Sequence, residues 1–223
     1  MFARMIALVS RLASLVAVLS LFAPESFATP VVWSIESGGN GHSYEFRPLA
    51  YTVSWSEANA AAEAMSLGDE SVSYLATVTS AEEQAFVQRA VLPACPGCVN
   101  KNQVWIGGRQ DPEGSTPSPS AGWRWIVNTE VAPESWSYTN WLSENEPSNE
   151  GQIDERFLTM WVHYYQTGQD LRGKWNDEKL VSPTTARVIG MIVEWSAPGV
   201  PEPATGALTA LGIALLALRR RRS

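Results

Sequence analysis

The two cysteines of the chain, Cys95 and Cys98, are separated only by a proline and a glycine, and this spacing permits three kinds of chemistry. A local disulfide that closes a tight turn is the simplest interpretation if the protein is exported. A thiol-redox centre needs such a pair at the start of a helix in a βαβ pattern, whereas this pair follows an expected helix. A zinc site needs more ligands than these cysteines and the distant His42 and His163 supply. We therefore expect a Cys95–Cys98 disulfide, with thiol-redox activity as a weaker alternative.

Acidic side chains in the second half of the chain offer a different chemistry. Glu146 and Asp177 could imitate the two carboxyl groups of a glycoside hydrolase. The sequence has no Gly-x-Ser-x-Gly motif, no histidine metal cluster and no glycine-rich phosphate loop. Its formal net charge of −7 repels phosphate backbones, so nucleic acid is not an expected partner. The same charge is compatible with cation binding.

Two expected helices precede a series of short strands. Ser54–Glu57 and Ser80–Glu83 are capping boxes, which predict helices that run to about Leu67 and about Leu92. The strands are expected at Tyr44–Phe46, Tyr74–Val78, Val104–Gly107, Gly122–Val127, Phe157–Trp161 and Val188–Trp195. The proline- and glycine-rich stretch Pro112–Gly122 predicts an exposed loop. This order favours an α+β fold with antiparallel sheets, and most of the ten tryptophans are expected to fill its core.

The N-terminus has the pattern of a secretory signal peptide. Arg4 and Arg11 give it a positive charge, Leu12–Phe22 supplies an apolar core, and Ser26–Ala28 offers small residues for cleavage. We therefore expect residues 1–28 to be removed. The rest of the chain is long enough for one domain rather than two.

The C-terminus has three parts in a fixed order. Pro201, Glu202 and Pro203 are followed by the apolar run Ala204–Leu218 and then by Arg219–Arg222. The apolar run is shorter than the ~17 residues that a spanning helix needs at least. The arginines are expected to stay cytoplasmic, which leaves the preceding chain outside.

This tail resembles the PEP-CTERM sorting signal of Gram-negative bacteria. The resemblance implies an exosortase-type processing enzyme as a partner, transient membrane insertion of the tail, and export across the inner membrane to the cell surface or beyond. An ordinary C-terminal transmembrane anchor is the alternative. The chain therefore divides into a signal peptide (1–28), one domain (29–197) and a sorting tail (198–223).

The domain contains an ordered series of short motifs. After the two expected helices, the series comprises Trp105–Gly108, Gly122–Trp125, Thr139–Trp141, Glu146–Ser148, Trp175–Asp177 and Ile192–Trp195. In this order and spacing they resemble a C-type lectin-like domain over about Ser37 to Trp195. The resemblance implies the C-type lectin-like fold, in which two helices and short antiparallel sheets support a long loop region.

In that family, a Glu-Pro-Asn segment and the Trp-Asn-Asp segment share one calcium ion. Calcium takes about six to eight oxygen ligands from carboxylates, amides and carbonyl groups. A cis bond before Pro147 would turn the neighbouring side chains to one side. The resemblance implies a Ca²⁺ site formed by Glu146, Ser148, Asp154, Asn176 and Asp177. It also implies that a sugar completes the calcium shell while contacting Glu146, Asn176 and, if the loop shifts by one residue, Asn149.

The sequence departs from the family pattern in three places. Ser148 stands where sugar-binding members have asparagine, so a hydroxyl replaces an amide ligand. Arg156 and Val193 stand where animal members have cysteines, so the fold must rely on its tryptophan-rich core. The stretch His163–Arg172 is longer than usual, which alters the rim of the site.

These observations predict an exported, calcium-dependent carbohydrate-binding module, whose ligand is a glycan or an extracellular polysaccharide. The resemblance assigns both Glu146 and Asp177 to calcium, so an enzyme is not expected. The alternative is a calcium-independent structural or protein-adhesion domain in the extracellular matrix. In that case the acidic residues form a solvated loop in a fold that has lost its ion.

Overall fold

The structure is a computed structural model that describes residues 29–49, 53–69, 71–95, 97–110, 118–128, 130–131, 135–148, 155–180 and 187–196. The expected signal peptide and sorting tail lie outside these residues, as do Asn149 and Asp154. No helix in the described part is long and apolar enough to cross a membrane.

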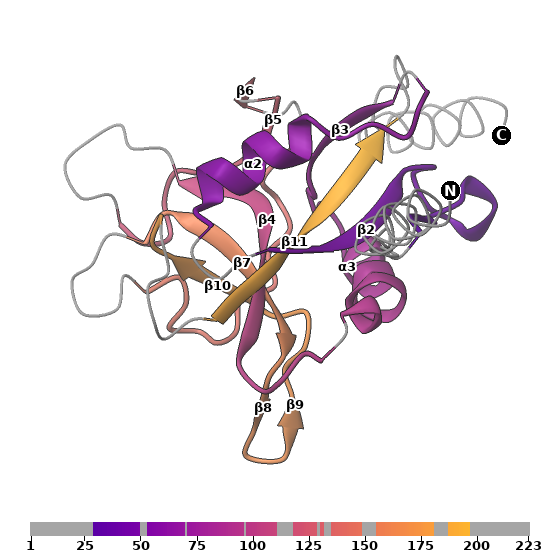
Figure 1. Cartoon of the computed structure of the whole chain (residues 1–223). Coiled ribbons are helices and arrows are strands. Elements are labelled where there is room, and N and C mark those ends of the chain that lie inside the picture. Colours follow the sequence, from indigo (N-terminus) through magenta and orange to yellow (C-terminus); the bar gives the residue numbers. More distant parts are fainter. Residues whose placement is uncertain are drawn as a thin grey trace, which may run out of the picture.

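Within the described residues, a nine-stranded sheet forms the centre of the molecule (Figure 1). Its main path runs through β1 (Val31–Val32), β2 (Ser43–Pro48), β11 (Arg187–Ser196), β4 (Asn102–Gln110), β5 (Trp123–Val127) and β6 (Glu130–Val131). The remaining strands are β3 (Val72–Leu75), which pairs with β11, and β7 (Phe157–His163), which joins β4 to β10 (Trp175–Glu178). All of these pairings are antiparallel except that of β11 with β4. A separate hairpin of β8 (Tyr165–Gln166) and β9 (Gln169–Asp170) projects from the sheet.

The first helix, α2 (Trp55–Glu63), begins with the expected capping box. Ser54 accepts a hydrogen bond from the N–H of Glu57, and the Glu57 carboxylate accepts one from the N–H of Ser54. The helix ends before the expected Leu67. The carbonyl oxygen of Met65 there accepts a hydrogen bond of 2.6 Å from the hydroxyl of Ser73 in β3. This bond ties the chain just after α2 to β3.

The second helix changes its winding along its length. It begins as α3 (Ala81–Phe86), continues as the π-helical η2 (Val87–Val91) and ends as the 3-10 helix η3 (Leu92–Ala94). Another short 3-10 helix, η1 (Ile35–Ser37), lies between β1 and β2. The expected end near Leu92 is therefore close to the end observed, although the regular α-helical part is shorter.

Two hydrophobic clusters lie against opposite faces of the central strands. Successive side chains of a strand point to opposite faces, so Val104 and Ile106 of β4 join one cluster while Trp105 joins the other. The first cluster contains the buried residues of η2, and the second contains those of α2. Most of the ten tryptophans are buried in this core, as expected; only Trp33, Trp136 and Trp141 keep intermediate exposure. The predicted α+β class is confirmed.

Candidate functional site

The segment that leads to Glu146 runs alongside the start of β10. The N–H of Trp175 donates to the carbonyl oxygen of Asn140 over 2.8 Å, and the N–H of Leu142 donates to the carbonyl oxygen of Trp175 over 2.9 Å. Trp141 and Trp175 form a parallel bridge between these bonds. Two segments that are distant in the sequence are therefore held together by backbone hydrogen bonds.

Gln84 of α3 holds Trp175 from the other side. The indole Nε1 of Trp175, which is fully buried, donates to Oε1 of Gln84 over 2.9 Å. Nε2 of Gln84 donates to the carbonyl oxygen of Gly173 over 3.0 Å. Gly173 has a φ of +78°, and a Cβ atom there would lie 2.7 Å from Nε2 of Gln84. The positive φ thus favours glycine at the turn into β10, and a larger residue would also displace the side chain of Gln84.

The loop after Leu142 brings Glu146 to Asp177 on β10. The peptide bond between Glu146 and Pro147 is cis, and the N–H of Ser148 donates to Oδ2 of Asp177 over 2.9 Å. Burial, the hydrogen bond to the Asp177 side chain and the charge of Asp177 raise the pKa of Glu146 to about 7. The negative charge of Asp177 opposes ionisation of Glu146, because two neighbouring carboxylates repel each other.

Asn176 precedes Asp177 on β10 and is half-buried. Its Nδ2 donates to the carbonyl oxygen of Asp177 over 2.7 Å, so its amide oxygen is the side-chain atom that can coordinate a cation. Its own carbonyl oxygen accepts a hydrogen bond of 3.0 Å from the hydroxyl of Thr159 in β7. The residue is therefore held by β7 next to the carboxyl pair.

A further glutamate, Glu178, extends this acidic region, and the motif comparison did not identify it. Glu178 is buried at the end of β10, where its Oε1 accepts a hydrogen bond of 3.0 Å from Gln103. Burial and the charges of Glu155 and Asp177 raise the pKa of Glu178 to about 7, although the Gln103 bond lowers it. Its position directly after Asp177 was the one available signal in the sequence.

The structure describes some of the residues of the predicted site and leaves others out. The structure brings Glu146, Ser148 and Asp177 together and places Asn176 beside them, whereas Asn149 and Asp154 fall outside the described residues. Among the residues that are described, no three histidine, cysteine, aspartate or glutamate side chains are grouped as a metal site. A calcium site here would therefore need the Asn176 amide, backbone carbonyl groups or residues outside the described part.

The donor set fits a hard cation. Oε2 of Glu146 is buried and has no hydrogen-bond partner within the described residues, and carboxylate and amide oxygens are the ligands that calcium prefers. A cation between Glu146 and Asp177 would compete with the proton that the raised pKa of Glu146 favours. The residues present are therefore compatible with calcium.

The other predicted features lie away from this site. Cys95 and Cys98 are joined by a disulfide. Asn100, just after this turn, accepts a hydrogen bond of 2.8 Å at Oδ1 from the N–H of Tyr165 in the hairpin. Val193, at a position where animal members have cysteine, is fully buried in the core. The disulfide turn thus contacts the inserted hairpin rather than the acidic site.

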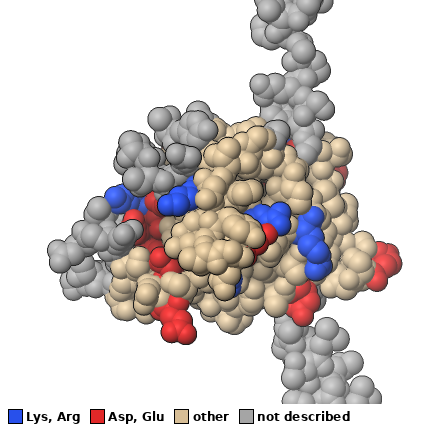
Figure 2. Space-filling model, turned by 90° about the horizontal axis from the view of Figure 1, so that it is seen from below, with Lys and Arg blue, Asp and Glu red and all other residues tan. Residues whose placement is uncertain are grey.

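Charged side chains are dispersed over the face from which the hairpin projects. Figure 2 shows acidic and basic groups in small separate areas of this face, with no broad basic surface among the described residues. A basic stripe is the usual footprint of a nucleic-acid-binding protein. The charge distribution on this face gives no support to such a partner.

Comparison with known proteins gives the family. The Lectin C-type domain matches residues 54–179, a range that includes both helices and the Glu146–Asp177 pair. No curated protein matches the sequence.

Several solved structures resemble the chain at low sequence identity. The C-type lectin CEL-I from Cucumaria echinata is 19% identical, with 78% of this chain and 98% of that protein covered and a TM-score of 0.47. Ovocleidin-17 from the eggshell calcified layer of Gallus gallus is 20% identical, with 71% and 94% covered and a TM-score of 0.42. EMS16, an antagonist of the collagen receptor integrin α2β1, is 18% identical, with 78% and 99% covered and a TM-score of 0.41.

Proposed function

The chain belongs to the C-type lectin domain family, and we propose that it is a calcium-dependent glycan-binding module. Members of this family are generally binding domains rather than enzymes, and they typically bind Ca²⁺. The family match confirms the predicted C-type lectin-like fold. Calcium dependence and sugar binding in this chain are our proposal.

The observation that carries the proposal is the contact between Glu146 and Asp177. The cis Glu146–Pro147 loop and β10 bring one carboxyl group from each segment together, and the pKa of Glu146 rises to about 7 because of burial and Asp177. Such a pair holds a proton in acid and offers two negative charges to a cation once the proton leaves. Asn176 supplies an amide oxygen next to it.

A bound calcium ion would supply open coordination positions for two neighbouring hydroxyl groups of a sugar. The residues of this chain would orient that sugar: Glu146 accepts hydrogen bonds from hydroxyl groups, and the Asn176 amide lies beside it on β10. Trp175 cannot act as a sugar platform because it is fully buried. Specificity therefore depends on polar contacts rather than on stacking against this tryptophan.

A calcium-independent adhesion domain is the second candidate, and one observation favours it. Asp177 already accepts a hydrogen bond from the N–H of Ser148, and the Glu146 carboxyl is hydrogen-bonded to Asp177. A proton on Glu146 removes one of the two negative charges, so this contact does not depend on an ion. Ser148 also stands where the family pattern has asparagine, so one amide ligand for calcium is missing. This difference favours the calcium-independent domain as well.

A glycan panel distinguishes the two candidates. The chain is applied to immobilised polysaccharides and simple sugars in millimolar calcium and again in chelator, with Asp170→Ala as a control. That substitution removes only an exposed ion pair with Arg172 on the hairpin. Binding that disappears in chelator for both proteins supports the calcium-dependent module. Glycan binding that persists in chelator contradicts calcium dependence, and an absence of glycan binding in both buffers supports the adhesion domain.

We also propose that the protein is exported and sorted to the cell surface. The proposal rests on the signal-like N-terminus and on Pro201, Glu202, Pro203 and the segments that follow them. Mass spectrometry of the extracellular protein should detect a chain that lacks residues 1–28 and the final arginines. An extracellular chain with an intact C-terminus contradicts processing at this tail.

A further inference from the structure

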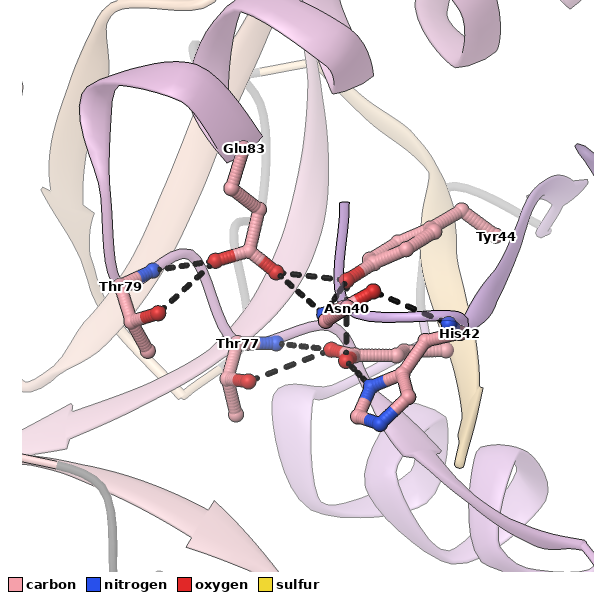
Figure 3. Close-up of polar contacts among 7 residues, drawn as sticks. Asn40, His42, Tyr44, Thr77, Thr79 and Glu83 are labelled. Atoms are coloured by element: carbon pink, nitrogen blue, oxygen red, sulfur yellow. Dashed lines mark hydrogen bonds and ion pairs between the residues drawn. The ribbon is translucent and has the colours of Figure 1, made fainter. Parts of the chain in front are cut away.

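A second group of buried carboxyl groups lies apart from the candidate calcium site. Figure 3 shows side chains from three parts of the fold that meet around the hydroxyl of Tyr44. Asn40, His42 and Tyr44 belong to the segment that enters β2, Glu83 to α3, and Glu194 to β11. The side chains of Tyr44, Glu83 and Glu194 are at most 2% exposed.

Glu194 is the acceptor for several donors. Its Oε2 accepts hydrogen bonds from the N–H of Thr77 over 2.8 Å and from the Thr77 hydroxyl over 3.2 Å. Its Oε1 lies 2.6 Å from Nδ1 of His42 and 3.1 Å from the hydroxyl oxygen of Tyr44. This environment suits an ionised carboxylate, because charged acceptors form the stronger hydrogen bonds.

Both carboxyl oxygens of Glu83 also have hydrogen-bond partners. Its Oε2 accepts hydrogen bonds from the N–H of Thr79 over 2.7 Å and from the Thr79 hydroxyl over 3.0 Å. Its Oε1 lies 2.6 Å from the hydroxyl oxygen of Tyr44. The Tyr44 hydroxyl therefore faces a carboxyl oxygen from each glutamate.

Counting hydrogens identifies an additional proton. The hydroxyl of Tyr44 has one hydrogen to donate and accepts another from Nδ2 of Asn40 over 2.7 Å. This single hydrogen can point to only one of the two carboxyl oxygens, at 2.6 Å in Glu83 or at 3.1 Å in Glu194. The other contact is a hydrogen bond only when that carboxyl group is protonated and donates to Tyr44. Both contacts are therefore satisfied when the carboxyl pair holds one proton, and the three contacts that Glu194 makes with Thr77 and His42 favour Glu83 as the group that holds it.

We propose that Glu83, Tyr44 and Glu194 form a pH-sensitive clasp, which is strongest while Glu83 holds its proton and weakens when that proton leaves. The clasp joins the segment that enters β2 to the start of α3 and to β11. Loss of the proton would leave two buried carboxylates around one hydroxyl group. Their mutual repulsion, at low effective dielectric, opposes the docking of these three elements.

The electrostatic surroundings support this proposal. Burial and the charge of Glu194 raise the pKa of Glu83 to about 8, and burial and both glutamates raise the pKa of Tyr44 well above its usual value. The titratable groups that act on Glu83 are Tyr44 from β2 and Glu194 from β11, and His42 from the β2 side pairs with Glu194. No lysine or arginine pairs with either glutamate in the part of the chain that the structure describes.

The clasp shares its helix with the candidate binding site. Glu83 is followed by Gln84, whose side chain holds Trp175 and Gly173 at the start of β10. A weaker attachment of α3 to β2 and β11 would therefore act on the same helix that positions the strand carrying Asn176 and Asp177. This placement gives the clasp a route to the site.

The sign of the pH effect follows from linkage. Glu83 in the unfolded chain has an ordinary pKa of about 4.3, whereas its pKa in the folded protein is about 8. The folded state therefore binds the proton more tightly, and its stabilising effect is complete below about pH 4. It decreases as the pH rises through about 8 and then stays constant.

The test compares the pH dependence of unfolding in the full chain and in two variants. Glu83→Gln keeps an acceptor for Thr79 and a donor for Tyr44, as in protonated Glu83, but cannot ionise. Glu82→Gln, at the exposed neighbouring position, is the matched control. Unfolding in denaturant is measured in chelator and detergent from about pH 5 to about pH 9.

We expect the unfolding constant of the wild type, relative to that of Glu83→Gln, to rise by a factor of roughly 10² or more between about pH 5 and about pH 8. Glu82→Gln should follow the wild type. Parallel curves for the wild type and Glu83→Gln overturn the proposal. If Glu83→Gln does not fold, carbon-13 NMR of the assigned Glu83 carboxyl in the wild type decides: titration near pH 8 supports the clasp, and titration near pH 4 overturns it.

Discussion

The N–H of Ser148 donates a hydrogen bond of 2.9 Å to Oδ2 of Asp177, across a separation of 29 residues. This bond ties the Glu146–Pro147 loop to β10 at the point where the two carboxyl groups meet. The position of Ser148 matters twice, since its backbone orients Asp177 while its side chain replaces the amide of the family pattern. The backbone contact can persist after a side-chain substitution, so the two roles can be separated by experiment.

Ser148→Asn should strengthen calcium binding. The substitution restores an amide oxygen next to Glu146 and leaves the backbone N–H available to Asp177. Calcium at a hundred times its dissociation constant stabilises a fold by about 2.7 kcal/mol. For a domain of this size, each kcal/mol of stabilisation raises Tm by roughly 2–4 °C. Differential scanning calorimetry should show a larger calcium-induced rise in Tm for the variant. A smaller rise than in the wild type contradicts the assigned role of position 148.

Calcium affinity should depend on pH through Glu146. The pKa of this carboxyl is raised to about 7, so protons compete with calcium below that pH and the apparent Kd should increase by up to about tenfold per pH unit. The stability of the calcium-free fold should change with pH in the opposite sense to calcium affinity. Protonated Glu146 stabilises this fold in acid, and the stabilisation is lost as the pH rises through about 7.

The measurement is a calcium titration at about pH 6 and about pH 8, with Glu144→Gln as the control. Glu144 is exposed in the same loop, and its substitution should leave the pH dependence unchanged. An equal Kd at both pH values in the wild type would show that Glu146 is not a ligand.

Gln84→Ala should destabilise the domain. The substitution leaves the buried indole N–H of Trp175 and the carbonyl oxygen of Gly173 without their partner, and an unpaired buried polar group costs about 1–3 kcal/mol. Urea unfolding measures the loss. Gln169→Ala, at an exposed position in β9, is the control and should change stability little. Equal stability of both variants would show that Gln84 does not anchor β10.

Replacement of both Cys95 and Cys98 by serine should alter stability only modestly. The disulfide closes a very short loop, and such a closure removes less chain entropy than the roughly 3 kcal/mol of a 15-residue loop. Thermal unfolding of the variant under oxidising conditions measures the difference. A variant that fails to fold would show that the disulfide supports more than its own turn.

The elements with strong local signals could be predicted from the sequence. The Ser54–Glu57 capping box marks the start of α2, and apolar runs such as Val188–Trp195 correspond to central strands. The second capping box formed only in part: Ser80 accepts from the N–H of Glu83, but the Glu83 carboxyl turns to Thr79 and Tyr44 instead. Contacts with a distant strand outweighed the local pattern.

Local sequence patterns did not predict that β10 is a strand, nor which acidic residues lie around it. Trp175–Glu178 is rich in side chains that are uncommon in strands, and it is a strand because Thr159 and its neighbours in β7 pair with it. The family pattern identified Glu146 and Asp177, whereas Glu178 became visible only through its burial against Gln103. The sequence indicated only that the stretch His163–Arg172 is longer than usual, and it did not predict the hairpin of β8 and β9 within that stretch.

Isothermal titration of calcium into the wild type, Asp177→Ala and Asp170→Ala tests the central claim most directly. Asp177 is the buried carboxylate of the pair, so its loss removes a charged ligand, whereas Asp170 lies in an exposed ion pair on the hairpin. We predict saturable binding to the wild type and to Asp170→Ala, and no binding to Asp177→Ala. An absence of calcium binding to the wild type, or equal binding to all three proteins, would contradict a calcium site at Glu146 and Asp177.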